Sequence, residues 1–374
     1  MLSRLATLAT FAIALALVLV LAACAPGGRH GTLVETTIPA PSLAGSRFPN
    51  SPEQPAAIYL PPSYPSSGAA YPVVYYLPGF TTDVTEYLDG AFQGFNLREA
   101  MDRLIAAGTI GEMIVVVANG RNFLGGSFYA NSPVTGNWED FVVRDVVEYI
   151  DGRYRTIRSP DARGVAGESM GGFGALRLAM RHPGVFGCVY ALSPGLFAPG
   201  GLDRQGIFAE DKVAARRMVA AELATLPAAK AAGRFRTLVG ELYASGSRFN
   251  YYRAFGYAYG AAFAPDPGGP PPFIDYSSAG SRQRFEDGYG GLERKVALHA
   301  ENLRHLGGIV IDYGRNDRLA WIPEGCEHFS RLLREAGIEH EVRAHDGGHI
   351  DRWRQRFETQ ALPFFSARLA REPR

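Results

Sequence analysis

Three short stretches of the sequence hold side chains that could together carry out nucleophilic catalysis. Ser169 lies in a Gly-Glu-Ser-Met-Gly motif at 167–171, Asp317 follows an apolar run, and His349 follows two glycines near the C-terminal end. A serine hydroxyl attacks a carbonyl carbon when a histidine removes its proton and a carboxylate orients that histidine. The order Ser169, Asp317, His349 therefore predicts a serine hydrolase that forms an acyl-enzyme at Ser169.

The motif around Ser169 has the pattern of a nucleophile elbow. It follows the apolar run 164–166, which indicates a strand, and it precedes a helical pattern at 170–180. A sharp strand-to-helix turn presents the serine to substrate, and glycines on both sides leave room for that turn. The same motif also occurs in ordinary glycine-rich turns, so the interpretation depends on the partners of Ser169 further along the chain.

Two aspartates near the strand predicted at 309–312 are candidates for the catalytic acid. Asp312 lies within the strand, whereas Asp317 lies in the turn that follows it. Loops at the carboxyl ends of strands collect catalytic groups, which favours Asp317. His349 lies between the last predicted strand and the last helix, so it is the expected base. His345 comes earlier in that loop and is expected to face solvent or the sheet edge.

Two backbone N–H groups are expected to bind the carbonyl oxygen of the substrate as it gains negative charge. One belongs to Met170, the residue after the nucleophile. The other belongs to Phe80, where Gly79 lets the chain turn after the strand predicted at 71–77. Preorganised donors of this kind are worth about 3 kcal/mol each in the transition state. The sequence therefore predicts an oxyanion hole formed by Met170 and Phe80.

Short apolar runs alternate with helical patterns along most of the chain. Their near-continuous apolar character is typical of parallel strands that are covered on both faces. The sequence therefore predicts an α/β-hydrolase fold with a mainly parallel, doubly wound sheet. The predicted strands are an edge strand at 32–38 and then 57–60, 71–77, 112–118, 164–166, 186–192, 309–312 and 339–344, and the clearest helices are 138–150, 170–180 and 353–369.

A long insertion precedes the strand that carries the predicted acid. It covers 195–306, which is 112 residues and more than an ordinary crossover needs. It holds a helical pattern at 209–226 and then a cluster of aromatic residues. Two interpretations stay open, either a lid or pocket wall over Ser169 or a satellite core unrelated to substrate. The candidate substrate contacts are Trp138, Tyr252, Phe255 and Tyr257.

The N-terminal segment predicts export and lipid attachment. Residues 5–23 carry no charge and end in Leu-Ala-Ala before Cys24, which resembles a bacterial lipoprotein signal with Cys24 as the lipidated mature N-terminus. An uncleaved transmembrane anchor and an ordinary signal peptide are the alternatives. We expect a signal peptide at 1–23, a flexible tether at 24–54 and a hydrolase domain at 55–370, anchored in the bacterial cell envelope and facing the periplasm or the exterior.

Composition gives no reason to expect nucleic acid, a metal or a cofactor. The 374 residues carry a formal net charge of +1, with 47% hydrophobic and 20% charged residues, which describes a folded protein with an ample core and no polyanionic partner. The eight histidines are scattered without metal-ligand spacing. Cys188 and Cys326 lie in apolar or helical patterns and are expected to be buried thiols. The oligomeric state is left open.

Several of these stretches together resemble a known family. They are Ile-Tyr-Leu-Pro-Pro-Ser-Tyr at 58–64, Tyr-Pro-Val-Val-Tyr-Tyr-Leu-Pro-Gly at 71–79, the serine motif extended to Gly172, and the Gly-Gly-His at 347–349 with Trp353. The chain resembles the family described as "putative esterase", which includes S-formylglutathione hydrolase, feruloyl and acetylxylan esterases, siderophore esterases and the mycolyltransferase antigens. The resemblance covers about 55–365 apart from the insertion. It implies an α/β-hydrolase fold with Ser169, Asp317 and His349 as the triad.

The expected activity is hydrolysis of a small-molecule or carbohydrate carboxylic ester through an acyl-enzyme. Acyl transfer to a carbohydrate or lipid alcohol, as the mycolyltransferase branch implies, is one alternative. A non-catalytic surface-binding protein on a hydrolase scaffold is another, because a fold does not fix a function. Turnover of a short ester separates an enzyme from a binder, and product analysis with added alcohol separates a hydrolase from a transferase.

Overall fold

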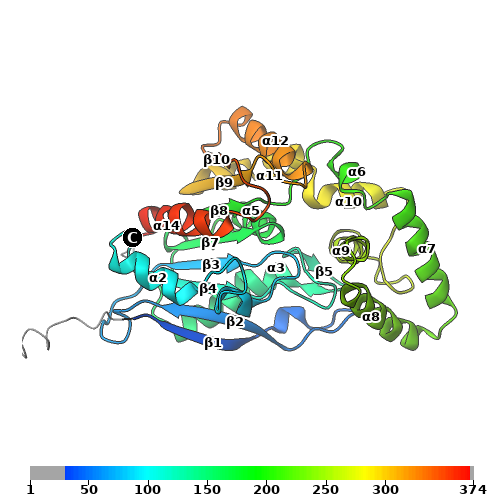
Figure 1. Ribbon diagram of the computed structural model, residues 1–374, viewed down its shortest axis with the longest axis horizontal. Coiled ribbons are helices and arrows are strands. Elements are labelled where there is room, and N and C mark those ends of the chain that lie inside the picture. Colours follow the sequence, from blue (N-terminus) through cyan, green and yellow to red (C-terminus); the bar gives the residue numbers. More distant parts are fainter. Residues whose placement is uncertain (1–29, 371–374) are drawn as a thin grey trace, which may run out of the picture.

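An eight-stranded sheet forms the centre of the molecule (Figure 1). The computed structural model describes residues 30–370. The strands are β1 (Thr32–Pro39), β2 (Glu53–Leu60), β3 (Val73–Leu77), β4 (Ile114–Ala118), β7 (Arg163–Glu168), β8 (Cys188–Leu192), β9 (Gly308–Gly314) and β10 (Glu341–His345). Their order in the sheet is β1-β2-β4-β3-β7-β8-β9-β10. The strands from β4 to β10 in this order are parallel, whereas β2 pairs antiparallel with both β1 and β4.

Helices cover both faces of this sheet. Along β3, Tyr75 belongs to the core on one face and Tyr76 to the core on the other, because successive side chains of a strand point to opposite faces. The Tyr76 face is covered by α2 (Leu97–Ala106), α13 (Trp353–Arg356), a π-helical turn (Phe357–Ala361) and α14 (Leu362–Arg368). The Tyr75 face is covered by α3 (Trp138–Asp140), α4 (Val147–Arg153), α5 (Met170–Arg181), α11 (Leu292–His305) and α12 (Trp321–Glu335). The predicted fold class is confirmed.

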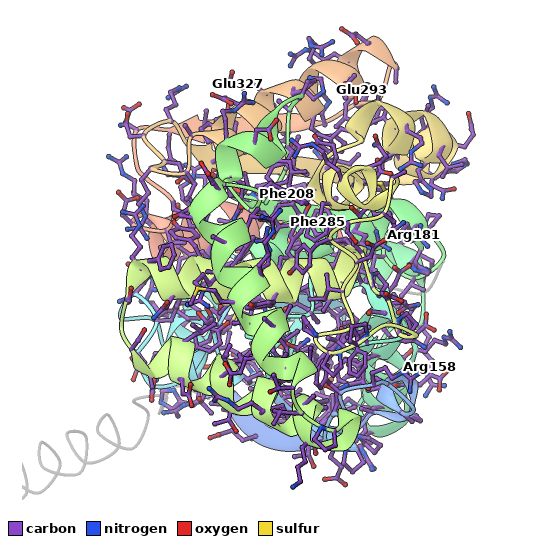
Figure 2. The ribbon with its side chains drawn as sticks, turned by 90° about the vertical axis from the view of Figure 1, so that its right-hand side faces the viewer. Arg158, Arg181, Phe208, Phe285, Glu293 and Glu327 are labelled. Atoms are coloured by element: carbon purple, nitrogen blue, oxygen red, sulfur yellow. The ribbon has the colours of Figure 1, made fainter. Side chains whose placement is uncertain are left out.

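The insertion at 195–306 forms a helical layer at the carboxyl ends of the parallel strands. Besides α11, its helices are α6 (Gly201–Gln205), α7 (Glu210–Ala224), α8 (Ala228–Ala244), α9 (Arg248–Phe263) and α10 (Ser281–Tyr289). Figure 1 shows α7, α8 and α9 at one end of the molecule. Figure 2 views that end, where the ring centroid of Phe208, in the turn before α7, lies 5.0 Å from that of Phe285 in α10. The insertion contacts the main body through Phe80, whose ring centroid lies 5.0 Å from that of Phe255 in α9.

The segment predicted as a flexible tether is folded from residue 32 onward. β1 pairs with β2 along its whole length, which confirms the edge strand predicted at 32–38. Ile38, Leu43 and Phe48 are buried in the core on the Tyr75 face. The Gly, Pro and Ser content of this segment pointed to a tether, but these three apolar side chains bury enough surface to fix it. The folded domain therefore includes residues 32–54, which the sequence had assigned to the tether.

Lipid attachment lies outside what the structure describes. Cys24 and the predicted signal peptide at 1–23 precede the described residues, so both stay predictions. Between residues 30 and 370, no helix has the length and apolar character needed to cross a membrane. The other two cysteines, Cys188 and Cys326, are buried free thiols, as predicted.

Candidate active site

Strand β7 and helix α5 hold Ser169 in a strained turn between them. Its backbone angles are φ 54° and ψ −114°, in the positive-φ region that residues with a Cβ rarely adopt. The Ser169 N–H donates to the Leu192 carbonyl at 2.9 Å, and the Ser169 carbonyl accepts from the Gly195 N–H at 3.1 Å. The end of β8 and the residues after it therefore hold Ser169 in this conformation.

The glycines of the motif are required because backbone approaches closely around this turn. A Cβ atom at Gly171 would lie 1.8 Å from the Leu77 carbonyl oxygen, and a Cβ atom at Gly167 would lie 2.5 Å from the Gly171 backbone. Neither neighbour can move aside, because one belongs to the central sheet and the other to α5. The strand–turn–helix geometry that the motif predicted is present.

Side-chain hydrogen bonds connect Ser169, His349 and Asp317 in a row. His349 Nε2 lies 3.0 Å from Ser169 Oγ, and His349 Nδ1 lies 2.6 Å from Asp317 Oδ2. The Asp317 side chain is fully buried, whereas that of His349 is 15% exposed. Asp317 Oδ1 also accepts the Leu319 N–H at 2.8 Å, which fixes the orientation of the carboxylate. The structure thus brings together the three side chains that the sequence singled out.

Hydrogen bonds between two loops hold the aspartate and the histidine in place. The Arg315 N–H donates to the His345 carbonyl at 2.8 Å. The Asn316 N–H donates to the Gly347 carbonyl at 3.0 Å, and Asn316 Nδ2 donates to the Asp346 carbonyl at 2.7 Å. Strands β9 and β10 are parallel neighbours, so the loops that follow them meet at the carboxyl edge of the sheet.

The rival acid, Asp312, belongs to a different network inside β9. It is 1% exposed, accepts the Tyr190 hydroxyl at 2.5 Å and forms an ion pair with Arg356 at 2.7 Å. The prediction for His345 is half right, because the residue ends the edge strand β10 but its side chain does not face solvent. The His345 side chain is 11% exposed, and its Nε2 lies 3.7 Å from Asp312 Oδ1. It points to the face of the sheet where Arg356 of α13 also lies, so the C-terminal helices cover it.

Two backbone N–H groups beside Ser169 remain available to a substrate oxygen. The N–H groups of Met170 and Phe80 have no hydrogen-bond acceptor among the residues that the structure describes. Met170 is the first residue of α5, where unpaired N–H groups and the helix dipole favour negative charge. The Phe80 side chain lines the same cleft as Ser169. The oxyanion role of both N–H groups stays a prediction.

Glu168, the residue before the nucleophile, is the centre of a buried network that the sequence did not reveal. Its carboxyl accepts the Gly79 N–H at 2.6 Å, the Tyr87 hydroxyl at 2.5 Å and also the Tyr76 hydroxyl. Trp353 Nε1 in turn donates to the Tyr76 hydroxyl at 2.7 Å. Burial raises the pKa of Glu168 to about 7, although the hydrogen-bond donors act to lower it. Glu168 thus connects the elbow to the loop after β3.

Ser169 and His349 open into a cleft of about 460 Å³ whose walls come largely from the insertion. Tyr252 and Phe255 line this cleft, as predicted. Helix α9 thus contributes both to the cleft wall and to a buried core, since two of its other aromatic residues, Tyr257 and Tyr259, are buried. Whether the insertion selects the substrate stays a prediction. The cleft residues that sequence reasoning missed include Gln205, Tyr243, Arg248, Tyr251, Tyr289, Arg318 and Trp321.

Trp138 and Tyr257 do not line the cleft, so their prediction as substrate contacts is wrong. Trp138 is fully buried, and its Nε1 donates to the Thr135 carbonyl at 2.8 Å. Tyr257 is 1% exposed, and its ring packs edge-on against Phe235. Two residues along a helix turn the side chain by about 200°, so Tyr257 points away from the cleft that Phe255 lines.

Within 30–370, no group of three His, Cys, Asp or Glu side chains could hold a metal ion.

The fold and the elbow define the class of the protein. A doubly wound, mainly parallel sheet with a serine on a strand-to-helix turn is an α/β-hydrolase. The family model described as "Putative esterase" matches residues 51–226, a span that contains the elbow. Over this span, which is just under half of the chain, the sequence is similar to this esterase family.

Individual relatives are similar over part or most of the chain. An esterase of Mycobacterium tuberculosis is 35% identical over 134 residues, which are 34% of this chain and 26% of that protein. This chain therefore matches about a quarter of that relative's length. The solved structure of a ferulic acid esterase has a TM-score of 0.58 at 21% identity and covers 90% of this chain and 98% of its own. A fluorophosphonate-binding serine hydrolase of Staphylococcus aureus has a TM-score of 0.56 at 14% identity, with 90% and 99% covered. At these identities the two structures establish the fold.

Proposed function

We propose that this protein is a serine esterase that hydrolyses a carboxylic ester through an acyl-enzyme at Ser169. The observation that carries the proposal is the row of hydrogen bonds from Asp317 through His349 to Ser169, which opens into a cleft in a chain that is similar to an esterase family. The names of its relatives support an ester as the bond that is broken, because one is an esterase and another a ferulic acid esterase.

In the first half of the reaction, Ser169 becomes acylated. His349 Nε2 takes the proton of the Ser169 hydroxyl as its oxygen attacks the ester carbonyl carbon. The carbonyl oxygen gains negative charge and is held by the N–H groups of Met170 and Phe80. His349 then gives its proton to the leaving alcohol oxygen, and the bond between that oxygen and the acyl carbon breaks. Asp317 keeps His349 Nδ1 protonated and stabilises the positive charge of the imidazolium.

In the second half, water releases the acid. His349 takes a proton from a water molecule while the water oxygen attacks the acyl carbon. The tetrahedral intermediate collapses, and His349 returns the proton to Ser169 Oγ. The product is a free carboxylic acid, and the enzyme is restored.

The proposal predicts turnover of a short activated ester such as p-nitrophenyl acetate, with an acetyl adduct on the peptide that contains Ser169. The measurements are release of p-nitrophenolate and mass spectrometry of rapidly quenched enzyme. Free acid as the only acyl product supports hydrolysis, whereas a new ester formed from an added alcohol or sugar supports acyl transfer. A folded protein that neither turns over esters nor becomes acylated would be a binder on a hydrolase scaffold, and the proposal would fail.

We also propose that the enzyme is anchored in the bacterial cell envelope through a lipid on Cys24, on the basis of the N-terminal sequence alone. Cys24→Ser is expected to release the protein from membranes or to block its processing, because a diacylated cysteine supplies enough buried CH₂ groups for stable attachment. Membrane fractionation and mass spectrometry of the mature N-terminus measure this. An unmodified N-terminal peptide that begins upstream of Cys24 would contradict lipid attachment and favour a retained anchor.

A further inference from the structure

Positively charged side chains surround the outer part of the catalytic cleft. A second cavity of about 300 Å³, here called the outer pocket, shares six lining residues with the cleft of Ser169. Neither cavity is lined by an Asp or Glu side chain. The outer pocket is lined by Arg204, Gln205, Lys212, Arg248, Tyr252, Arg318, Leu319, Ala320 and Trp321.

Three of these cations have no carboxylate partner within the described part of the chain. Arg204 is neutralised by an ion pair with Glu324 at 2.8 Å, but Lys212, Arg248 and Arg318 form no ion pair there. The neighbouring Asp211 accepts the Lys212 backbone N–H at 2.8 Å, but it acts on the Lys212 ammonium group only through its charge, and it lines neither cavity. Net positive charge therefore remains at the mouth of the cleft.

Two of the cations lie against the ring of Tyr252. Lys212 Nζ lies 5.3 Å and the Arg248 guanidinium carbon 5.6 Å from the centre of the Tyr252 ring, within the range of cation–π attraction. Lys212 comes from α7, Arg248 from α9 and Arg318 from the loop after Asp317, so three separate segments bring like charges together. Their mutual repulsion is relieved when an anion binds between them.

We infer that Lys212, Arg248 and Arg318 form a subsite for an anionic group, so that the substrate is an ester that also carries a carboxylate or a phosphate. The inference rests on the proposed esterase function and adds a substrate class to it. The anionic group binds in the outer pocket without reacting, while the ester carbonyl lies at Ser169. The anionic group contacts this subsite in both the ground state and the transition state, so its binding energy raises kcat/KM.

The test compares anionic esters with neutral esters of similar size and the same reacting ester group. The first series pairs p-nitrophenyl monoesters of glutaric, adipic and suberic acid with their neutral methyl esters, which places the charge on the acyl side at three lengths. The second pairs 4-acetoxybenzoate and 4-acetoxyphenyl phosphate with 4-acetoxybenzamide, which places a carboxylate or a phosphate on the alcohol side. We expect at least one anionic ester to exceed its neutral match in kcat/KM by about tenfold at low salt. At about 0.5 M NaCl this preference should shrink, because salt screens exposed charges.

Variants then assign the preference to the three cations. Arg318→Gln, Arg248→Gln and Lys212→Gln are each expected to lower the ratio of anionic to neutral kcat/KM by about 3- to 10-fold. Because the ratio compares two esters on one variant, any general loss of activity cancels. Arg217→Gln is the matched control, since it removes the same charge from α7 at an exposed position that lines neither cavity, and it should leave the ratio unchanged.

The outcomes separate this inference from the proposed function. If the wild type hydrolyses no ester, the proposed function itself fails. If it hydrolyses neutral esters but prefers no anionic match, or if the control lowers the ratio as much as the three variants do, the subsite is overturned while the esterase stands.

Discussion

Replacing Ser169 with alanine is expected to lower kcat for ester hydrolysis by about 10⁴- to 10⁶-fold, because the variant has no oxygen that can form an acyl-enzyme. The melting curve should change little, since the hydroxyl makes one side-chain hydrogen bond and the strained backbone is held by main-chain bonds. Initial rates on p-nitrophenyl acetate, at protein concentrations fixed by absorbance, give the ratio of kcat values. Thermal unfolding followed by circular dichroism gives the stability.

The other two members of the row should act as a unit with Ser169. His349→Ala and Asp317→Asn are each expected to reduce kcat by several orders of magnitude, and Ser169→Ala combined with His349→Ala should lose little more than either alone. Asp312→Asn is the control, because Asp312 pairs with Arg356. It should lower stability by about 3 kcal/mol while leaving kcat per folded molecule largely intact, since it leaves a buried charge unpaired. If Asp312→Asn matched Ser169→Ala in kcat with an unchanged melting curve, the choice of acid would be wrong.

Local patterns were sufficient to predict the elbow and the loops around it. The glycines at 167 and 171 mark a turn that only small residues allow, and the distances at Gly171 explain why. The positions of Asp317 and His349 followed from a general property of parallel sheets, which bring the loops at the carboxyl ends of neighbouring strands together. All parallel strands of a sheet end at the same edge, so both positions could be predicted without knowing the order of the strands.

The predictions that failed depended on distant contacts. Phe255 and Tyr257 are two residues apart in one aromatic run, and only the packing of α9 against the body decides which of them faces the cleft. Arg318 and Arg248 are 70 positions apart in the sequence (318 − 248 = 70), so the positive mouth of the cleft has no local signature. The segment at 32–54 has the composition of a tether, yet its few apolar side chains are buried against the core of the sheet.

Glu168→Ala is expected to destabilise the protein by about 3 kcal/mol or more below about pH 5, where the contribution of Glu168 is largest. The change leaves two tyrosine hydroxyls and the Gly79 N–H buried without their acceptor, and an unsatisfied buried polar group costs about 1–3 kcal/mol. It also frees the loop that presents the Phe80 N–H, so kcat should fall together with stability. Glu168→Gln keeps an acceptor oxygen at the same place and should retain most of the activity, which separates a positioning role from a general loss of packing.

The pH dependence of stability should distinguish Glu168→Gln from the wild type. The folded-state pKa of Glu168 is about 7, above its ordinary value of 4.5, so the folded state binds the proton more tightly than the unfolded state does. Its stabilising contribution is therefore complete below pH 4.5 and is lost as the pH rises through 7. A shift of this size corresponds to roughly 3 kcal/mol. Glutamine does not ionise, so the unfolding free energy of Glu168→Gln lacks this pH dependence. Urea titrations at several pH values measure the unfolding free energies of both proteins. The wild-type value minus the Glu168→Gln value should fall by about 3 kcal/mol between about pH 4.5 and 8. A difference independent of pH would mean that the Glu168 carboxylate remains charged in the folded protein, stabilised by its three donors despite its burial.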